Sequence, residues 1–482
     1  MTVTIDQTEG ILGQLLADSP HTFSVSDESG DHTGYRIRRW TQQTQFALQR
    51  SGVSPGDRVV VTTNRSARAF AQIIGVLNAR AIAVPIDTSL PTNRRTAIET
   101  NCGAKWAIST SADSSDQIRR TASDCDTQKD AEELAGSLLI YTSGSSGNPK
   151  GIVCPPSAIQ FAINAIHNRL GYRADDVIAQ PLPLTFDYGL YQLLLAMKSG
   201  AQVQLYPEGA AGPSFLSRLR NDGITVLPSM PVLSDTLIRV SQRRQHTLDQ
   251  IRLVTTTGGH CSSKQLDDLK RLAPHADVLP MYGLTECKRA TITVPGEPGE
   301  DNSAGRPLAG TQVVVMADHS KACDQEKVGE IHVGGPHVML GYWPLSDAEL
   351  NRSFYTAEDG TRWVATGDTG YIDQDGLLHV TGRQDDLFKH NGYRTSVSEV
   401  ETALLAIDGI THACVVPPDQ ATTYAAVFAG SISEEEVRTQ LADHLELAKH
   451  PPRLARMRRV PVTKNGKVDR QAIAAHLRKE IR

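Results

Sequence analysis

Apolar and polar residues follow a repeating strand–helix–strand order in the first three-quarters of the chain. Residues 58–62 form an apolar run that predicts a buried strand, and residues 66–78 predict a helix. A second apolar run at 81–86 predicts the next strand. Strands separated by a helix of this length are typical of a parallel sheet with helical crossovers.

The same order recurs further along and predicts an α/β fold with parallel sheets. A helix is expected near 190–198. The stretch 111–130 is polar and predicts a surface loop or a partly disordered segment. Further buried strands are expected at residues 137–140, 177–182, 201–205, 225–227, 253–256 and 277–279.

The pattern changes after residue 311 and again after residue 383. Short apolar runs between glycine turns first predict a β-rich subdomain, with strands at 312–316, 329–334 and 371–378. The last part then predicts a compact α+β unit, with helices at 397–407 and 433–445 and strands at 412–416 and 424–428. We therefore predict a large domain over residues 1–383 and a small, mobile domain over residues 384–482.

Composition narrows the class of protein. The chain has 482 residues, which is too long for one ordinary hydrophobic core, and its net charge of −5 favours neither nucleic acid nor a membrane as a partner. Its first residues lack a secretory pattern, and no apolar run reaches the roughly 18 residues that span a bilayer. Seven cysteines occur without a Cys-x-x-Cys pair, which predicts reduced thiols in the cytoplasm and argues against a zinc site.

Residues 141–151 carry the strongest chemical signal. Gly144 and Gly147 allow positive φ angles, and successive N–H groups in such a loop bind anions. Hydroxyl groups and one ammonium add donors; they belong to Thr142, Ser143, Ser145, Ser146 and Lys150. The run therefore predicts a loop that binds a polyphosphate.

Two other interpretations of this run are weaker. A Walker A loop needs Gly-Lys-Ser/Thr at the start of a helix, whereas here Pro149 precedes the lysine and Gly151 follows it. A flexible Ser/Gly linker needs neither the Pro-Lys-Gly ending nor the predicted strand before it.

On these residues, the segment resembles the phosphate-binding loop of the adenylate-forming superfamily. That family contains acyl-CoA synthetases, luciferases and the adenylation domains of nonribosomal peptide synthesis. Further motifs follow in the family's order down to residue 470, so the resemblance covers nearly the whole chain. It implies ATP as a substrate, with the loop binding the pyrophosphate portion.

The run Met281-Tyr-Gly-Leu-Thr-Glu286 matches the next family motif, and Gly283 within it predicts a sharp turn. In the family, the residue matching Tyr282 stacks on adenine and the one matching Thr285 meets the α-phosphate. The residue matching Glu286 helps to hold Mg²⁺, a cation that prefers carboxylate and phosphate oxygens. Without the phosphate loop, a Tyr-Gly turn with an exposed glutamate would be an equally good interpretation.

Further motifs complete the nucleotide site that the resemblance implies. Asp368 matches an aspartate that accepts hydrogen bonds from both ribose hydroxyls, which suits a carboxylate because it offers several acceptor positions. Arg383 matches a nucleotide-binding arginine, and Asp385 matches the hinge at which the small domain turns.

Another family segment works through backbone contacts near the adenine. Gly258 and Gly259 match it, although His260 stands where the family often has glutamate. We expect His260 to be an ordinary surface histidine.

The predicted small domain carries the last two motifs. Lys389, residues 392–394 and residues 399–401 match a motif that faces the thiol acceptor. Lys467 matches the lysine that bridges the substrate carboxylate and ATP, where its charge offsets the charge that builds as a carboxylate attacks phosphorus. Alone, a Gly-Lys pair would indicate a solvated loop; its place after four other motifs favours the catalytic role.

The acid that the enzyme activates is less clearly indicated. Asp187 matches the aspartate that pairs with the substrate ammonium in amino-acid-activating members, whereas many CoA ligases carry a histidine nearby. Lys288 and Arg289 would suit a second substrate carboxylate, as in stand-alone macrolactam-pathway enzymes that activate β-amino acids such as 3-methylaspartate. The alternative is a solvated basic pair or one that contacts phosphate. Other predicted pocket walls are Tyr188, Tyr191, Val232, Thr255, Thr257 and Met281.

We therefore expect a ligase that uses ATP and Mg²⁺ to convert an amino or β-amino acid into an acyl-AMP. The acyl group would then pass to the pantetheine thiol of a separate acyl or peptidyl carrier protein, or of free CoA. An acyl-CoA synthetase for an aliphatic or aryl acid is the alternative within the family. A non-catalytic nucleotide-binding or scaffold protein is the alternative outside it.

Overall fold

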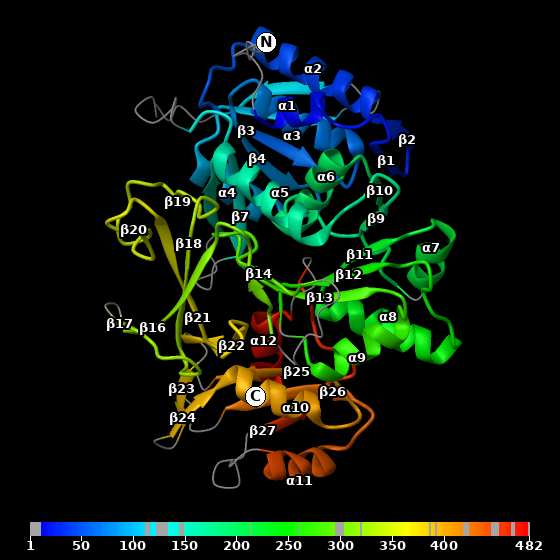
Figure 1. The fold of residues 1–482 in the computed structure, drawn as a ribbon, viewed down its shortest axis with the longest axis vertical. Helices are drawn as coiled ribbons and strands as arrows, with labels where there is room; N and C mark the ends of the chain where they lie inside the picture. Colours follow the sequence, from blue (N-terminus) through cyan, green and yellow to red (C-terminus); the bar gives the residue numbers. More distant parts are fainter. Residues whose placement is uncertain are drawn as a thin grey trace.

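The structure is a computed structural model. It contains two large sheets, a smaller antiparallel sheet, called the β-rich sheet below, and a C-terminal α+β unit (Figure 1). It describes residues 11–110, 116–121, 134–143, 149–212, 214–259, 261–294, 303–318, 321–384, 387–390, 393–417, 424–444, 453–463 and 468–480. None of the helices in these ranges is both long and apolar enough to cross a bilayer.

The first sheet has parallel strands at its centre and antiparallel strands at its edges. Because its central strands are buried on both faces, their sequences are almost continuously apolar. Its order is β19 (Gly341–Trp343), β8 (Pro149–Cys154), β7 (Leu138–Ser143), β4 (Ile82–Asp87), β3 (Arg58–Thr63), β5 (Trp106–Thr110) and β6 (Asp116–Arg120).

The second sheet is also parallel over its central strands, which run from β1 to β13 in space. Its order is β15 (Arg306–Pro307), β14 (Thr291–Ile292), β13 (Asp277–Tyr282), β12 (Leu253–Thr256), β11 (Val226–Ser229), β9 (Val177–Gln180), β10 (Gln202–Leu205), β1 (Ser24–Asp27) and β2 (Gly30–Thr33).

Helices cover these sheets in layers. One apolar core joins the facing sides of both sheets to helices that include α1 (Ile11–Ala17), α3 (Ala67–Asn78), α5 (Pro156–Leu170) and α6 (Asp187–Ser199). Helix α4 (Thr92–Cys102) packs on the other side of the first sheet, and α2 (Gly34–Arg50) packs on α3. The other side of the second sheet is covered by α7 (Phe215–Asn221), α8 (Pro231–Arg244) and α9 (Ser263–Leu272).

The β-rich sheet packs against the turn that follows β13, and so brings residues far apart in sequence to one place. It consists of β17 (Lys321–Ala322), β16 (Gln312–Asp318), β18 (Gly329–Gly334), β21 (Arg362–Ile372) and β20 (Phe354–Thr356), with β22 (Leu378–Arg383) paired to β21.

The C-terminal part has its own apolar cores on both faces of a small sheet. That sheet contains β25 (Ile410–Val416), β26 (Ala425–Gly430) and β27 (Arg453–Arg456). The ribbon β23 (Leu387–His390) and β24 (Tyr393–Ser396) precedes it, and its helices are α10 (Val397–Ala406), α11 (Glu434–His444) and α12 (Arg470–Glu480).

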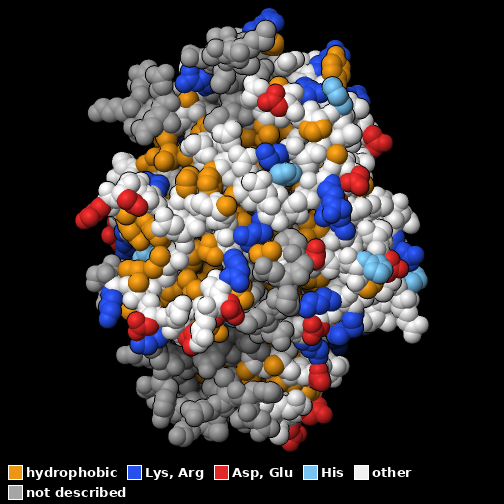
Figure 2. Space-filling view, viewed as in Figure 1, with side chains coloured by type: hydrophobic (Ala, Val, Ile, Leu, Met, Phe, Trp, Pro, Cys, Tyr) orange, Lys and Arg blue, Asp and Glu red, His pale blue; other side chains and the backbone are white. Residues whose placement is uncertain are grey.

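On the face seen in Figure 2, basic and acidic side chains are interspersed among polar and apolar ones. The side chains described there form no patch of a single charge, as expected from a net charge close to balance.

Two of the predicted elements differ from the structure. The strand predicted at 371–378 is wrong: β21 ends at Ile372, and a turn built around Asp373 leads into β22. The loop predicted at 111–130 contains β6, whose Asp116 is buried because Arg68, Gln72 and Thr44 donate hydrogen bonds to it. The rest of that stretch lies outside the described residues.

Two boundaries also shift. Strand β9 ends at Gln180, earlier than the predicted 182, and α6 begins at Asp187, earlier than the predicted 190. As a result, Asp187 lies in the first turn of a helix.

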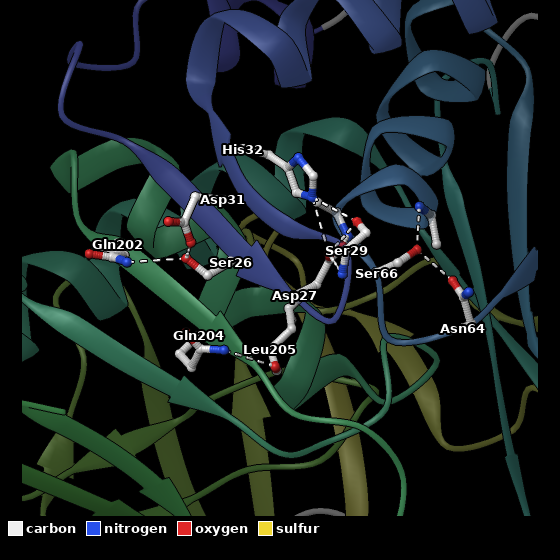
Figure 3. Close-up of polar contacts among 12 residues, drawn as sticks. Ser26, Asp27, Ser29, Asp31, His32, Asn64, Ser66, Gln202, Gln204 and Leu205 are labelled. Carbon is white, nitrogen blue, oxygen red and sulfur yellow. Dashed lines mark hydrogen bonds and ion pairs between the residues drawn. The ribbon is translucent and has the colours of Figure 1, made fainter. Parts of the chain in front are cut away.

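Figure 3 shows how the hairpin β1–β2 is tied to helix α3. The Asp27 carboxylate accepts hydrogen bonds from Ser29, from the ring of His32 and from the N–H of Ala67 at the start of α3. Burial opposes ionisation of Asp27, but these hydrogen bonds outweigh it and lower its pKa. A carboxylate at this helix terminus also suits the helix dipole.

Helices α8 and α9 contact the C-terminal unit through polar side chains. Lys264 of α9 forms an ion pair with Asp408. Asp235 of α8 accepts a hydrogen bond from Gln265, and its Oδ2 lies 3.8 Å from Nε2 of His412 on β25. Burial raises the pKa of Asp235 to about 6.

Asp235→Asn is expected to stabilise the protein at pH 8 more than at pH 5. The folded state holds the proton of Asp235 up to about pH 6, whereas the unfolded state releases it near the ordinary 3.8, so stability falls as pH rises through this window. A pKa shift of this size changes the free energy of unfolding by about 3 kcal/mol at most. Urea denaturation at both pH values measures the gain. Asp267→Asn on the exposed side of α9 is the control, and an equal gain for Asp235→Asn at both pH values would contradict the argument.

Candidate active site

The predicted phosphate loop is a hairpin between β7 and β8. Tyr141 to Ser143 continue β7, while Lys150 belongs to β8, and Thr142 lies directly across from Lys150. The prediction of one continuous loop is therefore wrong at both ends. Cross-strand pairing places a hydroxyl and an ammonium on neighbouring strands next to the turn. Gly144, Ser145, Ser146 and Gly147 lie outside the described residues.

The turn after β13 is closed tightly on itself. Strand β13 ends with Met281 and Tyr282, and a Cβ atom on Gly283 would overlap the carbonyl oxygen of Lys288. Only glycine fits at this position. Thr285 and Glu286 follow inside the turn, and the N–H of Met339 donates to the Glu286 carbonyl oxygen at 2.9 Å.

Three of the predicted nucleotide residues meet at one point. The Tyr282 hydroxyl donates to Oδ2 of Asp368 at 2.8 Å, and Nε of Arg383 lies 3.2 Å from Oδ1 of the same carboxylate. Burial, followed by the negative charge of Asp368, raises the pKa of Tyr282 well above its ordinary value, so the phenol remains a donor. These residues come from β13, β21 and β22, which the packing of the β-rich sheet brings together.

The part of strand β21 that carries Asp368 is also fixed. The hydroxyl of Thr366 donates to the carbonyl of Ile331 and accepts the N–H of Asp368, and the N–H of Gly367 donates to Glu330. Glu330 is a residue that the motif comparison did not single out.

Asp187 lies at the first residue of α6 and faces two cations. Its Oδ2 is 3.9 Å from Nζ of Lys288 and 3.8 Å from Nη1 of Arg289. All three side chains are at least nine-tenths buried, so the prediction of a solvated basic pair is wrong. Both separations exceed hydrogen-bond length, so the groups attract one another by charge without direct hydrogen bonds.

Aromatic rings and the backbone complete the surroundings of these cations. Arg289 lies over the Tyr188 ring at 4.6 Å and Lys288 over the Tyr191 ring at 5.6 Å. Nζ of Lys288 also donates to the carbonyl of Thr285 at 3.1 Å. Lys288 has a φ of 56°, which is uncommon for a residue with a side chain. In an extended chain, neighbouring side chains point to opposite sides. The left-handed conformation of Lys288 changes this, so Lys288 and Arg289 can both reach Asp187.

A small cavity adjoins this charge cluster and has room for about one water molecule. Six of the predicted pocket residues line it: Asp187, Tyr188, Tyr191, Met281, Lys288 and Arg289. Four others line it that the motifs did not indicate: Ile166, Leu170, Gln192 and Leu195. Gln192 and Leu195 lie in the helix that the sequence predicts near 190–198, whereas no element was expected from the sequence at Ile166 and Leu170 on α5.

Three predicted pocket walls do not line this cavity. Thr255 is buried, and its hydroxyl and carbonyl both contact the Tyr188 hydroxyl. Thr257 is buried after β12, and Val232 lies in the first turn of α8. Their contact with an acid substrate stays a prediction.

Other predicted residues are less completely described. Gly258 has a φ of 83°, and Gly259 lies against Pro231. His260, Asp385 and Lys467 lie outside the described residues, so their predicted roles stay untested.

Tyr342 was missed by the motif analysis. It lies on β19, its hydroxyl donates to Oε1 of Glu286 at 2.6 Å, and Nζ of Lys150 lies 5.2 Å from its ring centre. It therefore touches both the predicted phosphate-binding lysine and the predicted metal-binding carboxylate. Only the pairing of β19 with β8, which lies far earlier in the chain, reveals this.

The donors present fit a magnesium ion that is shared with phosphate oxygens. The described residues contain no group of three or more His, Cys, Asp or Glu side chains that could hold a metal. Mg²⁺ commonly takes one or two carboxylates and completes its coordination with phosphates and water. Glu286 is partly exposed and could supply that carboxylate.

The family of AMP-binding enzymes matches residues 17–343 of this chain. The chain belongs to this family. The predicted resemblance to adenylate-forming enzymes is thereby confirmed.

Two curated relatives show how much of a longer protein this chain matches. Bacitracin synthase 1 of Bacillus licheniformis is 27% identical over 433 residues, which is 88% of this chain and 8% of that protein. Pyochelin synthetase PchF of Pseudomonas aeruginosa is 31% identical over 418 residues, which is 83% of this chain and 23% of that protein. The chain thus spans less than half the length of these relatives.

A solved structure agrees with the fold. ATP-bound MatB from Rhodopseudomonas palustris aligns with a TM-score of 0.82 over 98% of this chain and 99% of its own, at 21% identity. The predicted α/β fold with a large N-terminal domain, a β-rich part and a smaller C-terminal domain is confirmed.

Proposed function

We propose that this AMP-binding enzyme converts an amino or β-amino acid with a second carboxylate into an acyl-AMP. We further propose that it transfers the acyl group to the pantetheine thiol of a separate carrier protein. The observation that carries the substrate class is the buried cluster of Asp187, Lys288 and Arg289. Formal charges of −1, +1 and +1 leave this cluster one positive charge in excess, in a place where Coulomb interactions are strong.

The positive excess suits a second carboxylate on the substrate, and the single acidic side chain suits the substrate ammonium. The ammonium would pair with Asp187 and the second carboxylate would lie between Lys288 and Arg289, so that each charged group of the cluster faces an opposite charge. A simple aliphatic acid would leave the cations and Asp187 paired only with one another. The spacings of 3.8 and 3.9 Å mean that a substrate would not first have to break direct hydrogen bonds between these groups.

In the proposed first step, an oxygen of the reacting carboxylate attacks the α-phosphorus of ATP, and the bond to the β-phosphate oxygen breaks. Pyrophosphate leaves, and its charge would be met by Lys150 and by the donors of the β7–β8 hairpin. Asp368 would accept the ribose hydroxyls. Mg²⁺, held by Glu286, would supply a positive charge to the phosphate oxygens.

Lys467 is proposed to enter the site and offset the negative charge that develops between the carboxylate and the α-phosphate. In the second step, the pantetheine sulfur attacks the carbonyl carbon, the bond to AMP breaks, and the thiol proton passes to solvent. The motif at Lys389 and residues 392–394 is proposed to face this thiol. The domain boundary near Asp385 is proposed as the hinge between the two steps.

Pyrophosphate exchange against a panel of acids tests the substrate class. We expect the strongest exchange with amino or β-amino acids that carry a second carboxylate, weaker exchange with neutral amino acids, and little with fatty or aryl acids. Arg289→Leu should reduce exchange with the dicarboxylic compounds by about tenfold or more, because a bidentate donor is lost. A strong fatty-acid signal without an amino-acid signal would instead favour an acyl-CoA synthetase.

The acceptor is tested in the same reactions. Thioester formation with a holo carrier protein and with free CoA distinguishes the two proposed acceptors. Absence of ATP-dependent AMP release with every acid would favour a non-catalytic nucleotide-binding protein.

A further inference from the structure

Edge strand β19 and the two residues before it are hydrogen-bonded to the elements that carry the predicted phosphate and metal residues. It pairs antiparallel with β8, where Tyr342 lies across from Ile152, two positions from Lys150. Just before it, the N–H of Met339 donates to the carbonyl of Glu286 at 2.9 Å and that of Leu340 to Val153 at 3.0 Å. The backbone of residues 339–343 therefore links β8 to the Thr285–Glu286 turn.

The Tyr342 side chain also links these two elements, because it contacts a functional group on each of them. Its hydroxyl donates to Oε1 of Glu286 at 2.6 Å, a short distance that is typical of a hydrogen bond to a carboxylate. Its ring lies beneath the ammonium of Lys150, with Nζ 5.2 Å from the ring centre, within the range of a cation–π contact. One side chain thus touches the groups expected to bind Mg²⁺ and pyrophosphate.

Neighbouring residues hold Tyr342 in place. Oδ1 of Asn351 accepts the N–H of Tyr342 at 2.6 Å, and Nδ2 of the same amide donates to the Tyr342 carbonyl at 3.0 Å. Phe354 packs edge-on against the Tyr342 ring, with centroids 5.4 Å apart. The tyrosine is therefore fixed in both backbone and ring orientation before any ligand binds.

We propose that Tyr342 is a positioning residue for the binding of ATP with Mg²⁺. By donating to Oε1, it orients the Glu286 carboxylate so that Oε2 is presented to the metal. Partners that hold a ligating carboxylate in this way usually change metal affinity by about 10- to 100-fold when removed. Its ring separately keeps the Lys150 ammonium beside the phosphate hairpin. The inference rests on the proposed function, because it assumes that Glu286 and Lys150 serve ATP and Mg²⁺.

Tyr342→Phe and Tyr342→Leu separate the two contacts. Calorimetric titration of ATP without an acid substrate, once with MgCl₂ and once with EDTA, gives a binding readout that does not depend on turnover. We expect Tyr342→Phe to weaken ATP binding by about tenfold with Mg²⁺ and to leave binding in EDTA unchanged, because only the Glu286 hydrogen bond is lost. Tyr342→Leu is expected to weaken ATP binding in EDTA as well, since the Lys150 ammonium loses its contact with an aromatic ring.

Tyr355→Phe is the matched control, because this tyrosine of β20 also loses a hydrogen bond, to His332, without touching Glu286 or Lys150. It should bind ATP as the wild type does under both conditions, and thermal midpoints of all variants check the fold. An unchanged Mg²⁺ effect in Tyr342→Phe would overturn the proposal, as would equal weakening with and without Mg²⁺. A wild-type protein that binds no ATP under either condition would overturn the proposed function itself.

Discussion

Asp187→Asn is expected to lower the stability of the folded protein and to remove its activation of amino acids. The change leaves Lys288 and Arg289 almost fully buried with their acidic partner neutralised. Removing one partner of a buried ion pair costs about 3–5 kcal/mol, which is a large part of the roughly 5–15 kcal/mol that stabilises a typical domain. Under the proposed function, the substrate ammonium also loses its partner. Urea denaturation and pyrophosphate exchange measure the two effects separately.

A second substitution provides the control for this prediction. In Asp187→Asn/Lys288→Met, one of the two cations is also removed, so the double variant should be more stable than Asp187→Asn alone. It should still fail to activate amino acids, because Asp187 is absent. If Asp187→Asn were as stable as the wild type, the three charges would not depend on one another as their geometry indicates.

Lys467→Ala is expected to reduce adenylation by at least about a hundredfold, the usual effect of removing one charge-stabilising donor from a reaction centre. The flanking residues are held independently of this side chain: Val462 pairs with Val468, and the N–H of Asp469 donates to the carbonyl of Pro461. The thermal midpoint should therefore remain within about 1 °C of the wild type. Pyrophosphate exchange measures the first half-reaction.

The same motif offers a matched control in Lys464, a second lysine three residues earlier. Lys464→Ala removes an equal charge and should retain most of the exchange activity. Lys467→Ala should also still convert a synthetic aminoacyl-AMP into a thioester, since that step does not need the adenylation lysine. Near-normal exchange in Lys467→Ala would show that the motif has been assigned wrongly.

The central strands could be predicted because their signal is local. Runs such as residues 58–62 and 253–256 are short and rich in β-branched residues, and they lie in β3 and β12. Strand β6 could not be predicted in this way, because it is polar. Its Asp116 is buried only through hydrogen bonds from Arg68, Gln72 and Thr44, which lie on helices far earlier in the chain.

The residues of the candidate site also fall into two groups: those that a local motif reveals and those that only the fold reveals. Residues within short motifs, such as Asp187, Lys288 and Asp368, could be found because they match, in order, motifs of the family that the chain resembles. The structure places Lys288 beside Asp187, and Arg383 beside Asp368. Tyr342 and Glu330 could not be found in this way, since their contacts depend on strand pairing between distant segments. That Lys288 and Arg289 both face Asp187 depended on a left-handed residue that no propensity would assign to lysine.

The closed turn between Tyr282 and Arg289 has a consequence for how this enzyme can diverge. Under the proposed function, its residues serve the nucleotide at one end and the acid at the other. Because Gly283 lies so close to the Lys288 carbonyl, the two ends cannot move independently. A substitution or insertion that reshapes the acid end would shift the nucleotide end as well. Descendants that acquire a new substrate are therefore expected to change first on α5 and α6, at positions such as Ile166, Tyr191 and Leu195, where a mutation alters the pocket without disturbing the shared turn.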